Sequence, residues 1–196
     1  RRNSVDMGRF TIEGSRPFAS LKPWAALKII GRQGYGLLFK RAKENTEALK
    51  QTLEGSGNFE ILNTPELFIL IYRFVPRHVR EQIQEWQARN RSAGKGKRDM
   101  ERSMRKVNYI INALNIKLHK ALRLDDTTFV SRTTLESTRY RPQNISVLRA
   151  CLINPLTDQD ILEEVVETQN RLGLELWPEF EAAYRKVVGN MRFSGS

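Results

Sequence analysis

The sequence has little cysteine and no long hydrophobic run, and each shortage excludes a class of protein. Cys151 is the single cysteine among 196 residues, so no disulfide can form within the chain and a reducing compartment is expected. No stretch approaches the ~18 apolar residues of a membrane-spanning helix, and the first residues lack the apolar segment of a secretory signal. We therefore predict a cytoplasmic protein with no membrane partner.

Histidine is nearly as scarce, and the motifs of common enzyme classes are missing. His78 and His119 lie far apart, and neither has metal-ligand spacing with Cys151 or with the other histidine, so no metal site is predicted. The chain contains no glycine-rich nucleotide loop and no nucleophile elbow. Local motifs therefore identify no catalytic residue within the chain.

Acidic residues are few relative to basic ones: 22 Asp and Glu stand against 33 Lys and Arg, which gives a net charge of +11. Such an excess can indicate nucleic-acid binding. The densest basic segment, residues 89–106, contains no aromatic side chain on which a base could stack. We predict no nucleic-acid partner, and keep a basic nucleic-acid-binding module that uses residues 89–106 as an alternative.

Hydrophobic periodicity predicts helices first and a small sheet later. Residues 18–30 and 35–53 have helical spacing, with Gly31 between them. The elements predicted after the break at 55–58 are strands at 59–62, 67–75, 127–135 and 145–153, and helices at 78–94, 99–123, 159–173 and 177–188. This order predicts an α+β module with a small antiparallel sheet, preceded by helices that need a further surface to cover.

The predicted strand 145–153 carries the most informative residue, Arg149. Because side chains alternate between the faces of a strand, Arg149 shares a face with Val147 and Cys151 and is expected in apolar surroundings. A buried guanidinium needs a fixed anion, since leaving the charge unpaired is costly. That anion is either a structural Asp or Glu or the carboxylate or phosphate of a ligand, and the pattern does not choose between them.

A second candidate site is Gly14-Ser15, just before the predicted helix that begins near Pro17. Glycine lets the backbone approach a ligand, serine adds a hydroxyl, and a helix N-terminus offers free N–H groups. These features suit a phosphate group. An ordinary helix cap is the alternative.

Two segments together resemble the group II pyridoxal-phosphate (PLP) dependent decarboxylases, which include glutamate, aspartate 1-, diaminobutyrate and aromatic amino-acid decarboxylases. The first is residues 9–17 with 27–35, and the second is residues 147–157 with the acidic amphipathic helix that follows. The resemblance implies the C-terminal part of a fold type I PLP enzyme, an α/β architecture. Residues 1–56 would be the helical end of its cofactor-binding large domain, 57–190 its small α+β domain with a short antiparallel sheet, and 191–196 a disordered tail.

The resemblance also implies roles for individual residues. Ser15, with Gly14, would contact the phosphate of the PLP held by the other subunit of a homodimer, and Arg149 would bind the α-carboxylate of an amino-acid substrate. The lysine that carries the cofactor is expected upstream of Arg1, because His119-Lys120 falls late in an amphipathic helix. The implied reaction removes the α-carboxylate, with aspartate or glutamate favoured as substrate; another fold type I PLP enzyme is an alternative.

Overall fold

The computed structural model describes residues 17–92, 97–125, 130–137 and 143–193. In chain order its elements are α1 (Leu21–Ser56), β1 (Phe59–Ile61), β2 (Ile69–Phe74), α2 (Arg77–Ser92), α3 (Lys97–Asp125), β3 (Ser131–Ser137), β4 (Gln143–Cys151), α4 (Gln159–Leu176) and α5 (Pro178–Phe193). The chain divides into two compact units, one ending at Lys40 and one beginning at Arg41. The domain boundary expected at residue 56 concerns a complete enzyme and stays a prediction.

The first unit is the beginning of α1, and its helix is interrupted at Gly31. Gly31 has φ 69° and ψ 174°, a backbone conformation that favours glycine. The break predicted at this residue is therefore confirmed. Pro23 does not cause it, because Pro23 lies in the first turn of α1, where a missing N–H removes no helical hydrogen bond.

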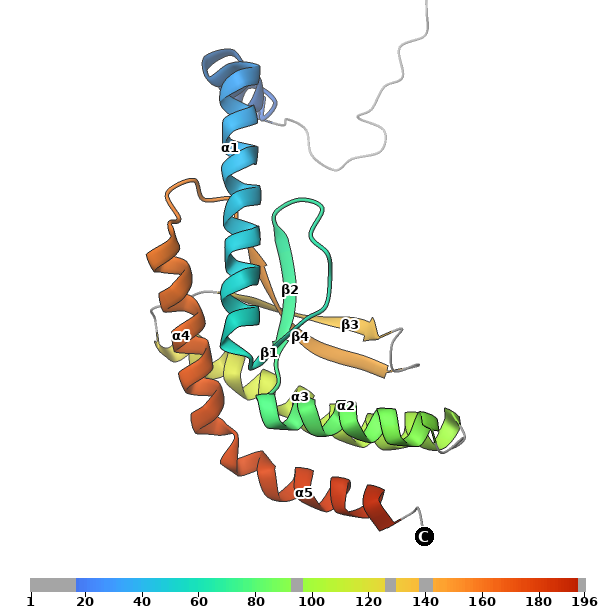
Figure 1. Ribbon diagram of the computed structural model, residues 1–196. Helices are drawn as coiled ribbons and strands as arrows, with labels where there is room; N and C mark the ends of the chain where they lie inside the picture. The colour runs from blue at the N-terminus through green and yellow to red at the C-terminus, as the bar shows by residue number, and fades with distance from the viewer. Residues whose placement is uncertain (1–16, 93–96, 126–129, 138–142, 194–196) are drawn as a thin grey trace, which may run out of the picture. The chain divides into compact units, whose positions relative to one another are not determined.

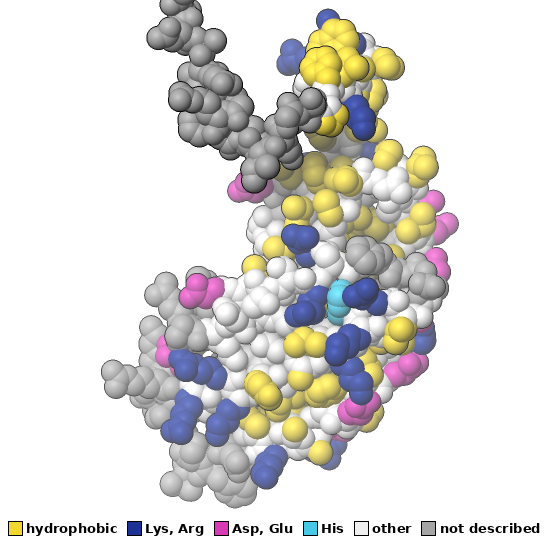
Figure 2. All heavy atoms as spheres, turned by 180° about the vertical axis from the view of Figure 1, so that it is seen from behind, with side chains coloured by type: hydrophobic (Ala, Val, Ile, Leu, Met, Phe, Trp, Pro, Cys, Tyr) yellow, Lys and Arg dark blue, Asp and Glu magenta, His cyan; other side chains and the backbone are white. Residues whose placement is uncertain are grey.

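Large apolar side chains of this first unit face outward, each more than two-fifths exposed: Phe18, Leu21, Trp24, Leu27, Ile29, Ile30, Leu37 and Phe39. In Figure 2 hydrophobic side chains gather on this segment. A helix normally buries such a face against another element. The expectation that these helices need a further surface agrees with this exposure.

The second unit contains an antiparallel sheet with strand order β1-β2-β4-β3 (Figure 1). β2 lies between β1 and β4, which confirms the prediction of a central strand. The strand β4 pairs with β2 through Ile69–Tyr72 and with β3 along the whole length of Ser131–Ser137. The sheet therefore places β4 between two neighbours, one apolar and one rich in Ser and Thr.

The core of this unit joins the sheet to the end of α1 and to α3, α4 and α5. Phe59 packs edge-on against Tyr72 and Phe74, with ring centroids 5.8 and 5.4 Å apart. The Tyr72 hydroxyl donates to Gln169 Oε1 of α4 over 3.0 Å, and burial raises the pKa of Tyr72 well above its usual value. The Asn58 side chain donates to Asn170 over 2.8 Å and so ties the loop after α1 to α4.

Three asparagines of α3 bind polar groups of the sheet where β2 and β4 stop pairing. Asn108, Asn112 and Asn115 follow the i, i+4, i+7 spacing of one helix face. Asn115 accepts from the Phe74 N–H (2.8 Å) and donates to the Phe74 carbonyl (2.9 Å). Asn112 accepts from the Ser146 N–H (2.9 Å). Asn112 and Asn115 therefore satisfy backbone groups that a neighbouring strand would otherwise bind, whereas Asn108 binds the side chains of Arg73 and Gln143.

Helix α4 begins as predicted but does not end as predicted. Its N-cap is Asp158, whose carboxylate accepts from the Ile161 N–H over 3.0 Å. The expectation that Gly173 ends the helix is wrong, because α4 continues to Leu176. A Cβ at Gly173 would lie 2.6 Å from the Phe74 ring. Gly173 is therefore required by the close approach of helix and strand.

The remaining boundaries shift by a few residues. β3 runs from Ser131 to Ser137, and residues 127–129 of the predicted 127–135 strand lie outside the described residues. β4 starts two residues earlier than predicted, at Gln143. α5 extends to Phe193, and the last part of the tail expected at 191–196 lies outside the described residues.

Candidate functional site

Arg149 stands on the open face of the sheet. Its Cα partners are Ile71 of β2 and Ser131 of β3. The Arg149 side chain is exposed, whereas its neighbours Leu148 and Ala150, on the opposite face, are buried. At this point the sheet is covered by the core on one face only.

The Arg149 guanidinium makes one hydrogen bond to the described part of the chain. Its Nε donates to Ser131 Oγ over 3.1 Å, and Ser131 Oγ donates to the carbonyl oxygen of Arg149 over 3.0 Å. Among the described residues, none of the ion pairs involves Arg149. The guanidinium therefore keeps donors available for an anion that this part of the chain does not supply.

The surface beside Arg149 is mainly apolar. Ile69, 41% exposed, pairs across the strands with the exposed Cys151, and Ile71 is half-buried. We call Ile69, Ile71, Ser131, Arg149 and Cys151 the open-face patch. A ligand that combines a carboxylate with a short carbon skeleton matches this combination of one cation and apolar neighbours.

The prediction for Arg149 is right about the strand and its apolar neighbours, but the side chain is exposed where burial was expected. Strand alternation determines which residues share a face, but not what covers that face. The sequence left open whether Arg149 pairs with a structural carboxylate or with a ligand anion. Among the described residues, no structural carboxylate pairs with Arg149. Gly14 and Ser15 lie outside the described residues, so their phosphate contact stays a prediction.

Ser131 is a site residue that was not predicted from the sequence. The residue lies in a predicted strand rich in Ser and Thr, and no local signal separates it from Thr133 or Thr134. Its importance comes from the register that places it opposite Arg149. That register depends on how β3 and β4 pair, which the sequence does not specify residue by residue.

A hollow of about 360 Å³ beside β2 and α2 is lined by several charged residues. Its arginines are engaged: Arg73 pairs with Glu60 (2.7 Å), Arg77 with Glu81 (3.5 Å), and Arg80 donates to the Phe59 carbonyl (2.7 Å). Because the chain itself supplies these acceptors, we interpret the charged residues around the hollow as part of the structural framework.

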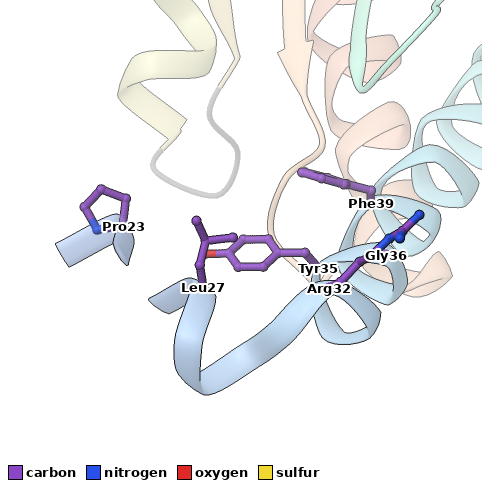
Figure 3. Close-up of a pocket in the computed structure, with 6 residues that line it drawn as sticks. All are labelled: Pro23, Leu27, Arg32, Tyr35, Gly36 and Phe39. Atoms are coloured by element: carbon purple, nitrogen blue, oxygen red, sulfur yellow. The ribbon is translucent and has the colours of Figure 1, made fainter. Parts of the chain in front are cut away.

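A second hollow, about 630 Å³ in volume, lies within the first unit. Figure 3 shows its lining residues on both arms of the bend at Gly31: Pro23, Leu27, Arg32, Tyr35, Gly36 and Phe39. The rings of Tyr35 and Phe39 have centroids 6.1 Å apart. This hollow is apolar and holds no concentration of chemically reactive groups.

The remaining site predictions concern charge, metals and membranes. Basic side chains predominate over acidic ones on the face seen in Figure 2. Arg89, at the start of the basic segment 89–106, pairs with Glu85 over 3.4 Å, and the side chains of 90–100 are not described.

In the described ranges, no three His, Cys, Asp or Glu residues come together as metal ligands. The described helices include none with the length and apolar character needed to cross a membrane.

Comparisons with known proteins identify relatives of this fold. No family model matches the chain. The chain is 31% identical over 173 residues to an aspartate 1-decarboxylase of Aliivibrio fischeri, an alignment that covers 88% of this chain and 29% of the relative. The structure matches mouse CSAD in its apo form with a TM-score of 0.61 and 20% identity, over 85% of this chain and 30% of that one. It matches Oryza sativa TDC with PLP and tryptamine with a TM-score of 0.59 and 15% identity, over 87% and 30%.

These similarities identify the class of protein whose fold the chain shares. The chain has the fold of the C-terminal part of group II PLP-dependent decarboxylases, which confirms both the predicted resemblance and the predicted fold class. One relative that the chain matches is an aspartate 1-decarboxylase, and the chain spans less than a third of that protein's length.

Proposed function

We propose that this chain is the C-terminal portion of a PLP-dependent decarboxylase that removes the α-carboxylate of an amino acid, with aspartate or glutamate favoured. The observation that carries the proposal is the exposed Arg149 guanidinium, which has apolar neighbours and no described acidic partner. The similarity to an aspartate 1-decarboxylase supports the choice of an acidic substrate.

Arg149 would act by holding the α-carboxylate. Arginine offers parallel N–H donors that match the two oxygens of a carboxylate, so the ligand is fixed in orientation as well as in position. PLP, when bound, supplies the electron sink for the reaction. Gly14 and Ser15 would hold its phosphate, as the resemblance implies, and a lysine outside residues 1–196 would carry it.

The exposed apolar surface of residues 17–40 supports a larger assembly. Large apolar side chains gathered on an exposed segment usually mark a contact with another domain or subunit. We infer that the remainder of the enzyme, and the second subunit of a homodimer, cover it. Ser15, two residues before the described region, would then reach the cofactor of the partner subunit.

The proposal is tested with Arg149→Ala in the complete enzyme that contains this chain. We expect kcat/KM for the preferred amino acid to fall by roughly a hundredfold or more, because charge-assisted hydrogen bonds to the substrate are lost. Arg132→Ala is the matched control, since Arg132 is an exposed arginine on the adjacent strand.

Activity is measured as CO2 release from aspartate, glutamate, diaminobutyrate and aromatic amino acids in turn. An unchanged kcat/KM in Arg149→Ala would remove this residue from the site. Transfer of the amino group without CO2 release would favour another fold type I PLP enzyme.

A further inference from the structure

The hydroxyl of Ser131 is engaged in two directions at once. It donates its proton to the Arg149 carbonyl (3.0 Å) and accepts from the Arg149 Nε (3.1 Å). A hydroxyl has one proton and two acceptor lone pairs. Because the proton is committed to the backbone, a lone pair is directed at the guanidinium. The contact therefore fixes the orientation of the hydroxyl as well as its position.

This contact restricts the Arg149 side chain. Arginine has several rotatable bonds and loses much conformational freedom when it binds a ligand from an exposed position. Ser131 holds Nε on one side, and the cross-strand partner Ile71 flanks the side chain on the other. The aliphatic stem of Arg149 is therefore placed between two strands before any ligand arrives.

The same contact decides which edge of the guanidinium remains available. A carboxylate can pair either with Nε and one terminal nitrogen or with the two terminal nitrogens, Nη1 and Nη2. Ser131 occupies Nε, and among the described residues none accepts from Nη1 or Nη2 of Arg149. The free edge is thus the one formed by the two terminal nitrogens.

We propose that Ser131 is the positioning residue of Arg149, and that it directs the two terminal nitrogens of the guanidinium to the α-carboxylate of the substrate. The inference rests on the proposed function, because it assumes that Arg149 binds that carboxylate. Ser131 touches neither substrate nor cofactor in this arrangement. It acts by reducing the freedom that Arg149 would otherwise lose on binding.

The test compares Ser131→Thr with Ser131→Val in the complete enzyme. The two side chains have nearly the same shape and both suit a β-strand, so the comparison isolates the hydroxyl. The probes are the amino acid that the CO2 assay finds decarboxylated, tested with L-aspartate first, and the α-carboxamide of that amino acid, which lacks the carboxylate.

We expect Ser131→Val to raise KM for the acid about tenfold, the size of one hydrogen bond, with a smaller change in kcat. The inhibition constant of the carboxamide should not change, and Ser131→Thr should behave as the wild type. Thr133→Val is the control, because Thr133 lies on the same face of β3 two residues further along, opposite Val147. A purely structural role of Ser131 would instead weaken acid and carboxamide alike, and that result overturns the proposal.

The Arg149→Ala and Ser131→Val variants distinguish a failure of this inference from a failure of the proposed function. If Arg149→Ala weakens binding of the acid but Ser131→Val does not, only the positioning role is wrong. If Arg149→Ala leaves KM and kcat for the acid unchanged, or no amino acid is decarboxylated, the proposed function fails and the inference fails with it.

Discussion

Arg73 and Arg149 occupy the same face of one sheet by strand alternation and have opposite surroundings. Arg73 is 2% exposed, pairs with Glu60 over 2.7 Å, and donates to Asn108 over 2.9 Å. Arg149 is exposed and has the Ser131 hydroxyl as its described partner. Burial obliges the first guanidinium to be saturated by the chain itself. The second keeps its charge available, which is what a ligand-binding arginine requires.

Residue type on a strand is therefore not sufficient to identify a binding site. Arg73 lies in the strand with the stronger apolar pattern, but its partners Glu60 and Asn108 make it part of the framework. What separates the two arginines is the supply of acceptors by neighbouring elements. Substitutions that remove one side chain at a time test this comparison directly.

The largest effect is expected for Arg73→Met. Loss of the guanidinium leaves the Glu60 carboxylate, whose side chain is 14% exposed, without this cation. Breaking such a buried pair costs about 3 kcal/mol of the free energy of unfolding. Arg149→Met, at an exposed position, should change it by less than about 0.5 kcal/mol. Urea-induced unfolding measures both.

The double variant Arg73→Met with Glu60→Gln sharpens this result. Neutralising the remaining partner should recover part of the lost stability, because the cost comes from the uncompensated charge. Equal stabilities of the Arg73→Met and Arg149→Met variants would show that the two arginines are not different in the way described.

A smaller loss is expected for Asn115→Ala, which tests the two asparagines of α3 that bind backbone groups of the sheet. Asn115 is fully buried and binds both the N–H and the carbonyl of Phe74. Leaving those buried groups without a partner should cost about 2–3 kcal/mol. Asn112→Ala, where the affected groups are nearer solvent, should cost about 1 kcal/mol. A thermal-unfolding series that ranks the two in the reverse order contradicts this account.

Local features of the fold could be predicted from the sequence because local physics determines them. The break at Gly31 follows from glycine chemistry, the start of α4 at Gln159 from the polar residues that precede its apolar periodicity, and the central position of β2 from its apolar run. Gly173 shows the limit of such reasoning. A glycine is needed at this position because the Phe74 ring, which is distant in sequence, leaves no space for a Cβ. A local rule for helix ends therefore gave the wrong result.

The candidate site shows the same division. Arg149 could be singled out because a charge in an apolar strand is unusual in any fold. Its exposure, and the partnership with Ser131, depend on how β3 pairs with β4 and on what covers the open face. These are non-local properties. The asparagines of α3 were likewise hidden in the apolar stripe of their helix, although their spacing carried a signal.

The smallest effect concerns His119, a basic group on α3 that is neither saturated by the chain like Arg73 nor open to a ligand like Arg149. Partial burial lowers the pKa of His119, the charges of Arg132 and Arg123 lower it further, and a hydrogen bond with the Val130 backbone opposes them. Since the folded-state pKa lies below the unfolded value of about 6.5, the unfolded chain binds more protons in between. The stabilising contribution is present above pH ~6.5 and is lost as the pH falls.

His119→Gln should remove this contribution to the pH dependence. We expect the free energy of unfolding of the wild type to decline more than that of His119→Gln between pH 7.5 and 5.5, as measured by urea unfolding at each pH. Arg132→Gln should fall between them, because it removes one of the two charges that disfavour the protonated ring. Parallel declines in all three proteins would mean that the surrounding arginines do not act on His119. Solvent screening would then be sufficient to cancel the effect of the arginine charges on the pKa of His119.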